Sequence, residues 1–200
     1  AIASLLRDQY DWPVGTQNIA ITNGSQSSFF TLFNLFSGEY LDGSQRRILL
    51  PLTPEYIGYG DIGLGKELFY SFRPNIEIRS QHEFKYHVDF DSLDVQEDTG
   101  AICISRPTNP TGNVVTDEEI RALHTIAKKR DIPLIIDSAY GAPFPNIIFP
   151  EVKPIWDPGV IVCLSLSKLG LPGVRTGIVI ANDTIIRAVT SANAILSLSP

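Results

Sequence analysis

One lysine stands in an unusual setting, among small and polar residues directly after an apolar run. Lys168 lies in "LSLSKLGLPGVRTG", which follows "VIVC", and Arg175 comes seven positions later. At the end of a buried strand a lysine amine would lose hydration, which favours the uncharged form that attacks an aldehyde. A structural lysine more often lies on a solvated helix face. The forked guanidinium of Arg175 suits a phosphate group.

A carboxylate stands in a similar position on another predicted strand. Asp137 directly follows the apolar residues of "PLIID". An ionised carboxylate there is costly unless a cation or a strong hydrogen-bond donor meets it. Tyr140, three residues later, could reach the same cavity. A helix-capping role for Asp137 is the alternative interpretation.

Two further segments offer hydrogen-bond donors just after a strand. In "TNGSQS", the residues Gly24, Ser25 and Gln26 open an uncharged helix, whose first amide groups can bind an anion. The alternative is that Ser25 is only the helix N-cap. In "SRPTNPTGN", proline and glycine predict a rigid turn that presents the side-chain amide of Asn109 to a ligand. The alternative here is an ordinary β-turn.

Other candidate sites are weaker. The glycine pattern "GYGDIG" at positions 58–63 is that of a dinucleotide fingerprint, but no strand precedes it directly and no good helix start follows, so a flexible loop is favoured. Cys103 and Cys163 lie in apolar runs without CxxC spacing, which predicts buried free thiols. The three histidines lack metal-ligand spacing, so we expect no metal site.

The rest of the sequence predicts the elements that must position these residues. Helices are expected over "SQSSFFTLFNLFSG", with Gly38 as its stop, and over "TDEEIRALHTIAKKR", where Thr116 and Glu119 form a capping-box pattern. Short β-branched runs alternate with them, and several are apolar throughout, as in a sheet covered on both faces. We therefore predict one α/β domain over residues 1–200, with a doubly wound sheet. The seven predicted strands are "IAIT", "RILLPL", "LFYSF", "AICIS", "PLIID", "VIVCLSL" and "GIVIA".

Composition narrows the function classes. The formal net charge is -6 and the pI is about 5.0, which argues against nucleic acid or an anionic membrane as a partner. No apolar run reaches the roughly 18 to 20 residues that cross a bilayer. Together with the predicted free thiols, these features favour the cytoplasm. The chain has no methionine and opens inside a predicted helix, so it could be a piece of a longer protein.

The motifs together resemble a known family. "GSQ", "PEYIGY", "NPTG", "DSAY" and "SLSKLGLPGVRTG" occur in this order over most of the chain. They resemble the class I/II pyridoxal-phosphate-dependent aminotransferases of fold type I. The runs "TNGSQSSFFTLFNLF", "PEYIGYGD", "FKYHVDF" and "SRPTNPTGNVVTDEE" are most similar to members that act on a small aliphatic amino acid, valine or alanine, with pyruvate as the acceptor.

The resemblance implies a role for each candidate residue. Lys168 matches the lysine that forms the internal aldimine, and Asp137 matches the aspartate that pairs with the pyridine nitrogen. Asn109 and Tyr140 match the pair that hydrogen-bonds the phenolic oxygen. Tyr56 matches the aromatic residue stacked on the ring. The residues implied in phosphate binding are Gly24, Ser25, Gln26, Ser165, Ser167 and Arg175.

The resemblance also implies an architecture. It predicts a three-layer sandwich with a mostly parallel seven-stranded sheet, whose last strand, "GIVIA", is antiparallel. Family members are homodimers with the active sites at the interface. They also have an N-terminal segment and a C-terminal small domain, which supplies the arginine for the substrate carboxylate. Neither is expected within these 200 residues.

Two other functions stay open at this point. Some transcriptional regulators carry an aminotransferase-like effector domain that binds the same cofactor. No basic winged-helix segment is present in the sequence, which disfavours that class. A domain fragment without activity is the remaining alternative, and the identity of the amino-acid substrate does not follow from these residues.

Overall fold

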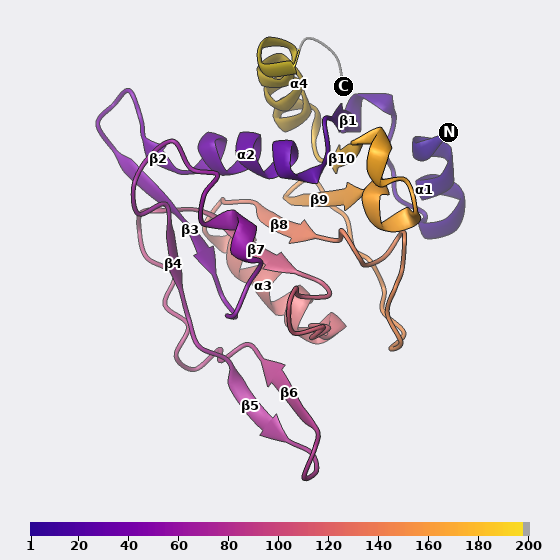
Figure 1. The fold of residues 1–200 in the computed structure, drawn as a ribbon. Coiled ribbons are helices and arrows are strands. Elements are labelled where there is room, and N and C mark those ends of the chain that lie inside the picture. Colours follow the sequence, from indigo (N-terminus) through magenta and orange to yellow (C-terminus); the bar gives the residue numbers. More distant parts are fainter. Residues whose placement is uncertain (198–200) are drawn as a thin grey trace.

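The computed structural model describes residues 1–197, in which a central sheet has helices on both faces (Figure 1). The sheet has eight strands, and the order along its main path is β2-β3-β7-β8-β9-β10-β1, with β4 paired to β3. Neighbours among β4, β3, β7, β8 and β9 are parallel, whereas β10 is antiparallel to both β9 and β1. The strands are β1 (Ile19–Thr22), β2 (Gly38–Glu39), β3 (Gln45–Leu50), β4 (Phe69–Ser71), β7 (Thr99–Ser105), β8 (Leu134–Asp137), β9 (Val160–Ser165) and β10 (Gly177–Ile180).

All seven strands predicted from the sequence are confirmed, including the antiparallel last one. The predicted count is one too low, because β2 is only two residues long and has no hydrophobic pattern. A separate hairpin of β5 (Asn75–Ile78) and β6 (Phe84–His87) was also not predicted. The sequence of β5, Asn-Ile-Glu-Ile, alternates between polar and apolar residues over only four positions, and all four are exposed, so neither face of the strand packs on a core.

The helices divide between the two faces of the sheet (Figure 1). One core cluster joins α2 and α4 to the sheet through Leu32, Phe33 and Val189, and the other joins α1 and α3 through Leu6 and Leu123. The amphipathic helix α4 was not predicted from the sequence. The helices are α1 (Ile2–Tyr10), α2 (Ser25–Phe36), α3 (Asp117–Lys129) and α4 (Asp183–Ser197), with short 3₁₀ turns η1 (Thr16–Asn18), η2 (Ile57–Tyr59), η3 (Leu166–Leu169) and η4 (Pro172–Val174).

The two helices expected from the sequence form for the predicted reasons. In α2 only Gln26 is exposed, and Gly38, just past its end, has a φ of 98° that disfavours other residues. At the start of α3, the Thr116 hydroxyl accepts from the Glu119 amide at 3.2 Å, and the Thr116 amide donates to the Glu119 carboxylate at 2.8 Å. This reciprocal capping holds the helix start.

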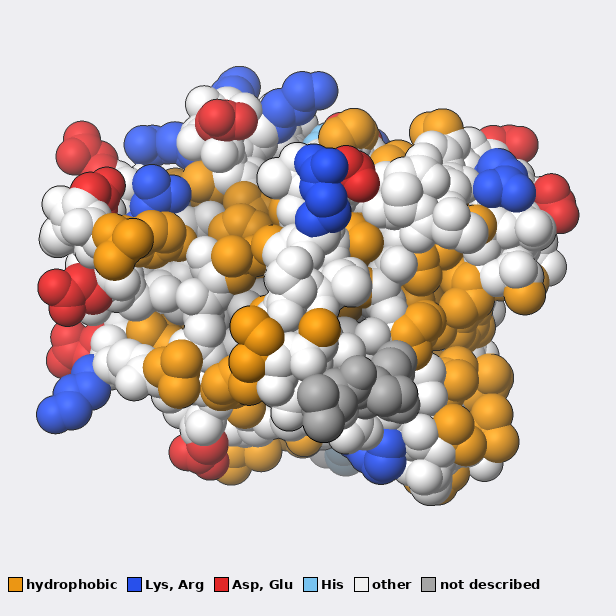
Figure 2. Space-filling view, turned by 90° about the horizontal axis from the view of Figure 1, so that it is seen from above, with side chains coloured by type: hydrophobic (Ala, Val, Ile, Leu, Met, Phe, Trp, Pro, Cys, Tyr) orange, Lys and Arg blue, Asp and Glu red, His pale blue; other side chains and the backbone are white. Residues whose placement is uncertain are grey.

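The surface around α4 has more hydrophobic and fewer charged side chains than the margins of the same view (Figure 2). In the view from that side, hydrophobic side chains are visible across the middle and charged side chains lie mainly toward the margins (Figure 2). Within residues 1–197, no helix combines the length and the apolar character needed to cross a bilayer. The exposed large apolar side chains of α4 and of the η3–η4 segment are Leu169, Leu171, Val174, Ile195 and Leu196.

The fold brings the ends of its central strands together. Ser105, the last residue of β7, is paired in register with Asp137, the last residue of β8, and β9 ends beside them at Ser165. All residues of these three strands are buried. Open α/β sheets bind ligands just beyond such carboxyl ends.

Candidate active site

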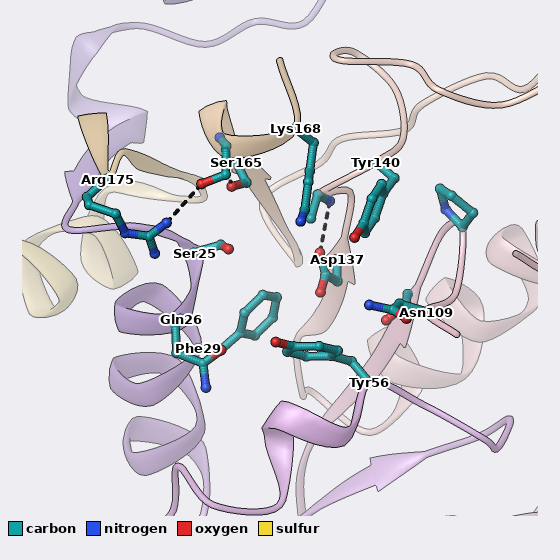
Figure 3. Close-up of a pocket in the computed structure, with 14 residues that line it drawn as sticks. Ser25, Gln26, Phe29, Tyr56, Asn109, Asp137, Tyr140, Ser165, Lys168 and Arg175 are labelled. Atoms are coloured by element: carbon teal, nitrogen blue, oxygen red, sulfur yellow. Dashed lines mark hydrogen bonds between the residues drawn. The ribbon is translucent and has the colours of Figure 1, made fainter. Parts of the chain in front are cut away.

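A cavity of about 370 Å³ opens at the carboxyl ends of β7, β8 and β9 (Figure 3). Ten of the eleven site residues predicted from the sequence line it, and Gly24 lies directly behind the lining. Phe29, Ser105, Pro107 and Ala139 also line the cavity but were not predicted. The ten predicted residues are Ser25, Gln26, Tyr56, Asn109, Asp137, Tyr140, Ser165, Ser167, Lys168 and Arg175.

Asp137 forms the buried acid of the cavity. One carboxylate oxygen accepts from the Tyr59 hydroxyl at 2.7 Å and the other from the Ala139 amide at 2.9 Å. Burial raises the pKa of Asp137, and the hydrogen bond from Tyr59 opposes that rise. The chain after Asp137 forms turns rather than a helix, so the helix-capping alternative is wrong. A cation in the cavity would therefore stabilise the ionised acid.

Behind Asp137 lies a polar network that was not predicted from the sequence. The Tyr59 hydroxyl is 3.2 Å from Ser105 Oγ, whose backbone amide donates to Glu55 Oε1 at 2.8 Å. The Ser105 hydroxyl also contacts Glu55 Oε2. Burial raises the pKa of Glu55 to about 7, against the hydrogen bonds from Ser105. Both Glu55 and Tyr59 belong to "PEYIGY", where only Tyr56 had been singled out.

Lys168 lies on η3 and directs its amine toward Asp137 and Tyr140 (Figure 3). Its Nζ is 5.0 Å from the centroid of the Tyr140 ring. The expectation of a dehydrated amine is wrong for this structure, because Lys168 is exposed. The 3₁₀ turn carries the lysine three residues beyond Ser165, where the buried strand ends, so it stands at the mouth of the cavity.

Donors for an anion gather at the other end of the cavity. Arg175 donates to Ser167 Oγ at 3.0 Å, and the Ser167 amide donates to Ser165 Oγ at 3.3 Å. Gly24 has a φ of 86°, and a Cβ there would lie 2.4 Å from Arg175 Nη2. The guanidinium therefore packs against the N-terminus of α2, whose first amide groups have no acceptor within the helix. The N-cap is Gly24, so the alternative of Ser25 as the cap is wrong.

The glycine-rich loop at 58–63 positions an aromatic ring. A Cβ on Gly58 would lie 2.4 Å from Tyr56 Cε1, so the tyrosine ring requires a glycine at this position. The Tyr56 ring meets Tyr59 edge to face, with 5.5 Å between the centroids. Gln26 Nε2 donates to the Gly58 carbonyl at 3.0 Å and ties the loop to α2. The loop itself does not line the cavity, but it packs behind the Tyr56 ring, which does.

Asn109 reaches the cavity from the turn after β7. The Gly112 amide donates to the Thr108 carbonyl at 2.7 Å, and the Thr108 amide donates to the Asn113 carbonyl at 2.9 Å. The segment is therefore a closed turn that presents Asn109 to the cavity, which is more than the ordinary β-turn of the alternative interpretation.

The arrangement fits one class of ligand chemically. Within residues 1–197, neither Lys168 nor Arg175 forms an ion pair with a carboxylate. The charge of Arg175 is thus available to an anion at one end, Asp137 offers a carboxylate to a cation at the other, and Lys168 is directed between them. Tyr56 and Phe29 supply aromatic surface between the ends. A planar ring with a protonated nitrogen, an aldehyde and an anionic group matches this donor set.

No cluster of three or more histidine, cysteine or carboxylate side chains in the described part of the chain could hold a metal ion. Both cysteines are buried free thiols, as their sequence context predicts. His87 and His124 contact carboxylates at 3.2 Å or less rather than each other.

Relatives of known sequence are aminotransferases. The chain is 58% identical over 199 residues to valine–pyruvate aminotransferase of Escherichia coli, covering 100% of this chain and 48% of that protein. It is 30% identical to the LL-diaminopimelate aminotransferase of Chlamydia pneumoniae, covering 83% of this chain and 39% of that protein. The chain thus spans about half the length of the first of these relatives, and less of the second.

Solved structures lead to the same group. The valine–pyruvate aminotransferase of Salmonella typhimurium superposes with a TM-score of 0.92 at 57% identity, covering 100% of this chain and 49% of that one. A putative amino-acid aminotransferase of Psychrobacter arcticum gives 0.95 at 50% identity, covering 100% and 48%. None of these relatives is a transcriptional regulator, so that alternative is not supported. Residues 1–199 match the family profile "Aminotransferase class I and II", and the chain belongs to that family.

Proposed function

We propose that this chain is the cofactor-binding part of a pyridoxal-phosphate-dependent aminotransferase. The observation that carries the proposal is the polarity of the cavity, with buried Asp137 at one end, the anion donors around Arg175 at the other, and Lys168 directed between them. When bound, pyridoxal phosphate supplies a ring that accepts electrons while an amino group is transferred. The fit of the donor set to its ring nitrogen, aldehyde and phosphate supports the assignment.

The site residues would then interact with different parts of the cofactor. Asp137 holds a proton on the ring nitrogen, and Asn109 and Tyr140 donate to the phenolic oxygen. Tyr56 orients the ring by packing on its face. Lys168 Nζ would hold the aldehyde, and the same amine would move a proton to and from the substrate α-carbon. The phosphate is held by the amide groups at the start of α2 together with Ser165, Ser167 and Arg175.

The substrate class rests on the relatives. At 58% identity to a valine–pyruvate aminotransferase, we infer a small aliphatic amino acid as donor, valine or alanine, and pyruvate as acceptor. A panel of amino acids with pyruvate, followed by chromatography of the keto acids, tests this directly. Faster turnover of aromatic donors than of valine and alanine would contradict it.

The cofactor assignment is tested by covalent trapping. After addition of pyridoxal phosphate and reduction with borohydride, mass spectrometry should locate the label on Lys168. Lys168→Ala should lose the label, whereas Lys66→Ala, which changes an exposed lysine outside the cavity lining, should keep it. Label on another lysine in the wild-type chain would refute the proposal.

We also infer a cytoplasmic homodimer. The exposed apolar side chains of the η3–η4 segment lie beside the cavity and would be covered by a second copy. Two buried free thiols are consistent with a reducing compartment. Light scattering that detects only monomer at high concentration would contradict the dimer.

A further inference from the structure

Glu55 contacts the cavity only through other side chains. It lies outside the set of lining residues, yet both of its carboxyl oxygens are engaged by Ser105. The Tyr56 amide also donates to Glu55 Oε2, at 3.3 Å. A carboxyl group buried behind a site, with hydrogen bonds leading into it, can act on that site through the network.

Four side chains form one continuous series. Glu55 Oε2 contacts Ser105 Oγ, Ser105 Oγ lies 3.2 Å from the Tyr59 hydroxyl, and that hydroxyl lies 2.7 Å from Asp137 Oδ2. The series therefore contains three contacts between oxygen atoms. Each contact needs one proton to be a hydrogen bond.

The three contacts of the series need three protons. The hydroxyls of Ser105 and Tyr59 bring two protons, so with both carboxyl groups ionised one of the three contacts has none. One further proton on Glu55 lets Glu55 donate to Ser105, Ser105 to Tyr59, and Tyr59 to Asp137. All three hydrogen bonds then point toward Asp137, which remains the ionised acceptor.

The surroundings favour that distribution. The titratable groups whose charges couple to that of Glu55 include Asp137, Tyr59 and Cys103, and none of these three is a cation. Burial raises the pKa of Tyr59 and of Cys103 well above their ordinary values, so both stay neutral. Burial and the charge of Asp137 raise the pKa of Glu55 to about 7, so the proton resides there below that pH.

We propose that Glu55 is a positioning residue whose proton orients the hydroxyls of Ser105 and Tyr59 toward Asp137. It touches neither cofactor nor substrate and acts only through this series. Loss of the proton reverses the Ser105 hydroxyl toward Glu55 and removes one hydrogen bond from the series. The consequence for the cofactor rests on the proposed function, whereas the coupling between the two carboxyl groups does not.

Carbon-13 NMR of the chain with labelled Glu and Asp carboxyl groups tests the coupling without cofactor. In wild type the Glu55 signal should titrate near pH 7, and the Asp137 signal should move with the same midpoint. Glu55→Gln, whose amide donates as a protonated acid would, should abolish that step in the Asp137 signal. Glu151→Gln, which changes an exposed carboxylate, should leave it intact.

Ser105→Ala separates the hydrogen-bond series from charge acting through space. Glu55 should still titrate in this variant, but the Asp137 signal should no longer follow it. An Asp137 shift of unchanged size in Ser105→Ala would overturn the proposal, as would a step that survives in Glu55→Gln. Tyr59→Phe keeps the ring and removes only the hydroxyl, so it gives the same test if Ser105→Ala does not fold.

Binding of pyridoxal phosphate tests the link to the site. The ratio of its dissociation constants at pH 8 and pH 6 should differ from wild type in Glu55→Gln and Ser105→Ala, and should be unchanged in Glu151→Gln. Equal ratios in all four proteins would overturn the role toward the cofactor. Failure of wild type to bind pyridoxal phosphate would instead refute the proposed function, and the NMR titration would still decide the coupling.

Discussion

The two ends of the cavity are built in different ways. At the acid end, Asp137 is 8% exposed, ends a buried strand and has a partner for each carboxylate oxygen. At the cation end, Arg175 is exposed and lies beside a 3₁₀ turn, and Lys168, exposed on the preceding 3₁₀ turn, is directed between the two ends. The acid end is thus organised by the sheet itself, whereas the cation end is an open set of donors that an anion would draw together.

The difference matters because burial determines how much free energy a charged group contributes. A buried carboxylate that loses its partner costs several kcal/mol, while an exposed cation keeps its water and contributes little by itself. Substitutions at the acid end should therefore have larger effects on cofactor binding than substitutions at the cation end. The predictions that follow test this ranking, beginning with the largest effect.

Removing the buried acid should have the largest effect. Asp137→Ala should weaken pyridoxal phosphate binding by about a hundredfold or more, since breaking a buried ion pair costs roughly 3–5 kcal/mol. Asp137→Asn keeps the shape and loses the charge, so a similar loss would assign the effect to charge. Fluorescence titration measures both, with Asp8→Asn as an exposed control. A loss smaller than that at Arg175 would contradict the ranking.

The acid end should also make stability depend on pH. Folded Glu55 has a pKa of about 7 against an ordinary value of 4.5, so between these values the unfolded chain has released a proton that the folded chain retains. The free energy of unfolding should therefore fall as the pH rises, by about 3 kcal/mol for this group. Urea unfolding at pH 4.5 to 7.5 measures it, and Glu55→Gln should lack this part of the slope. Identical slopes in the two proteins would contradict the pKa.

At the cation end the expected loss is smaller. Arg175→Leu should weaken pyridoxal phosphate binding by about ten- to a hundredfold, since hydrogen bonds to charged groups contribute roughly 1.5–3 kcal/mol. Arg175→Lys should recover part of the loss, because a point charge replaces the forked donor. Inorganic phosphate as a competitor identifies the affected end, since it should compete less well in Arg175→Leu. Unchanged competition would show that Arg175 does not meet the phosphate.

The same contrast explains which parts could be predicted from the sequence. Strands and their terminal residues were predictable, because an apolar run that ends in Asp137 or Ser165 is a local signal. The network behind Asp137 was not, because Tyr59 and Asp137 are 78 positions apart and neither pattern names the other. Contacts between distant segments depend on packing, which periodicity alone does not specify.

Solvent exposure was the other quantity that the sequence did not reveal. The apolar run before Lys168 indicated a buried amine, but the residues that follow form a 3₁₀ turn that lifts it out of the sheet. The nearby glycine did not indicate this exposure either. Gly170 has a φ of 90° and ends the 3₁₀ turn, but it does not determine whether Lys168 is buried. In β5 the exposure is equally unmarked in the sequence, because Asn-Ile-Glu-Ile alternates like a half-buried strand although all four residues are exposed.

The smallest expected effect concerns Gly24, where backbone conformation and the cation end meet. Gly24→Ala places a Cβ at a φ of 86°, 2.4 Å from Arg175 Nη2, so the guanidinium must move. Gly43→Ala is a matched control, with a φ of 79° and no atom within 4 Å. Both should lose about 1–3 kcal/mol of stability, because alanine rarely adopts a positive φ.

Only Gly24→Ala should also weaken pyridoxal phosphate binding, because only there does the added methyl displace a phosphate donor. Urea unfolding and fluorescence titration of the two variants separate strain from displacement. Equal binding in both would mean that Arg175 relaxes around the methyl group, as an exposed side chain held by one hydrogen bond to Ser167 could. That result would make the difference between the two ends larger. The exposed Arg175 would then tolerate a displacement, whereas the buried Asp137 is held by a partner at each carboxylate oxygen.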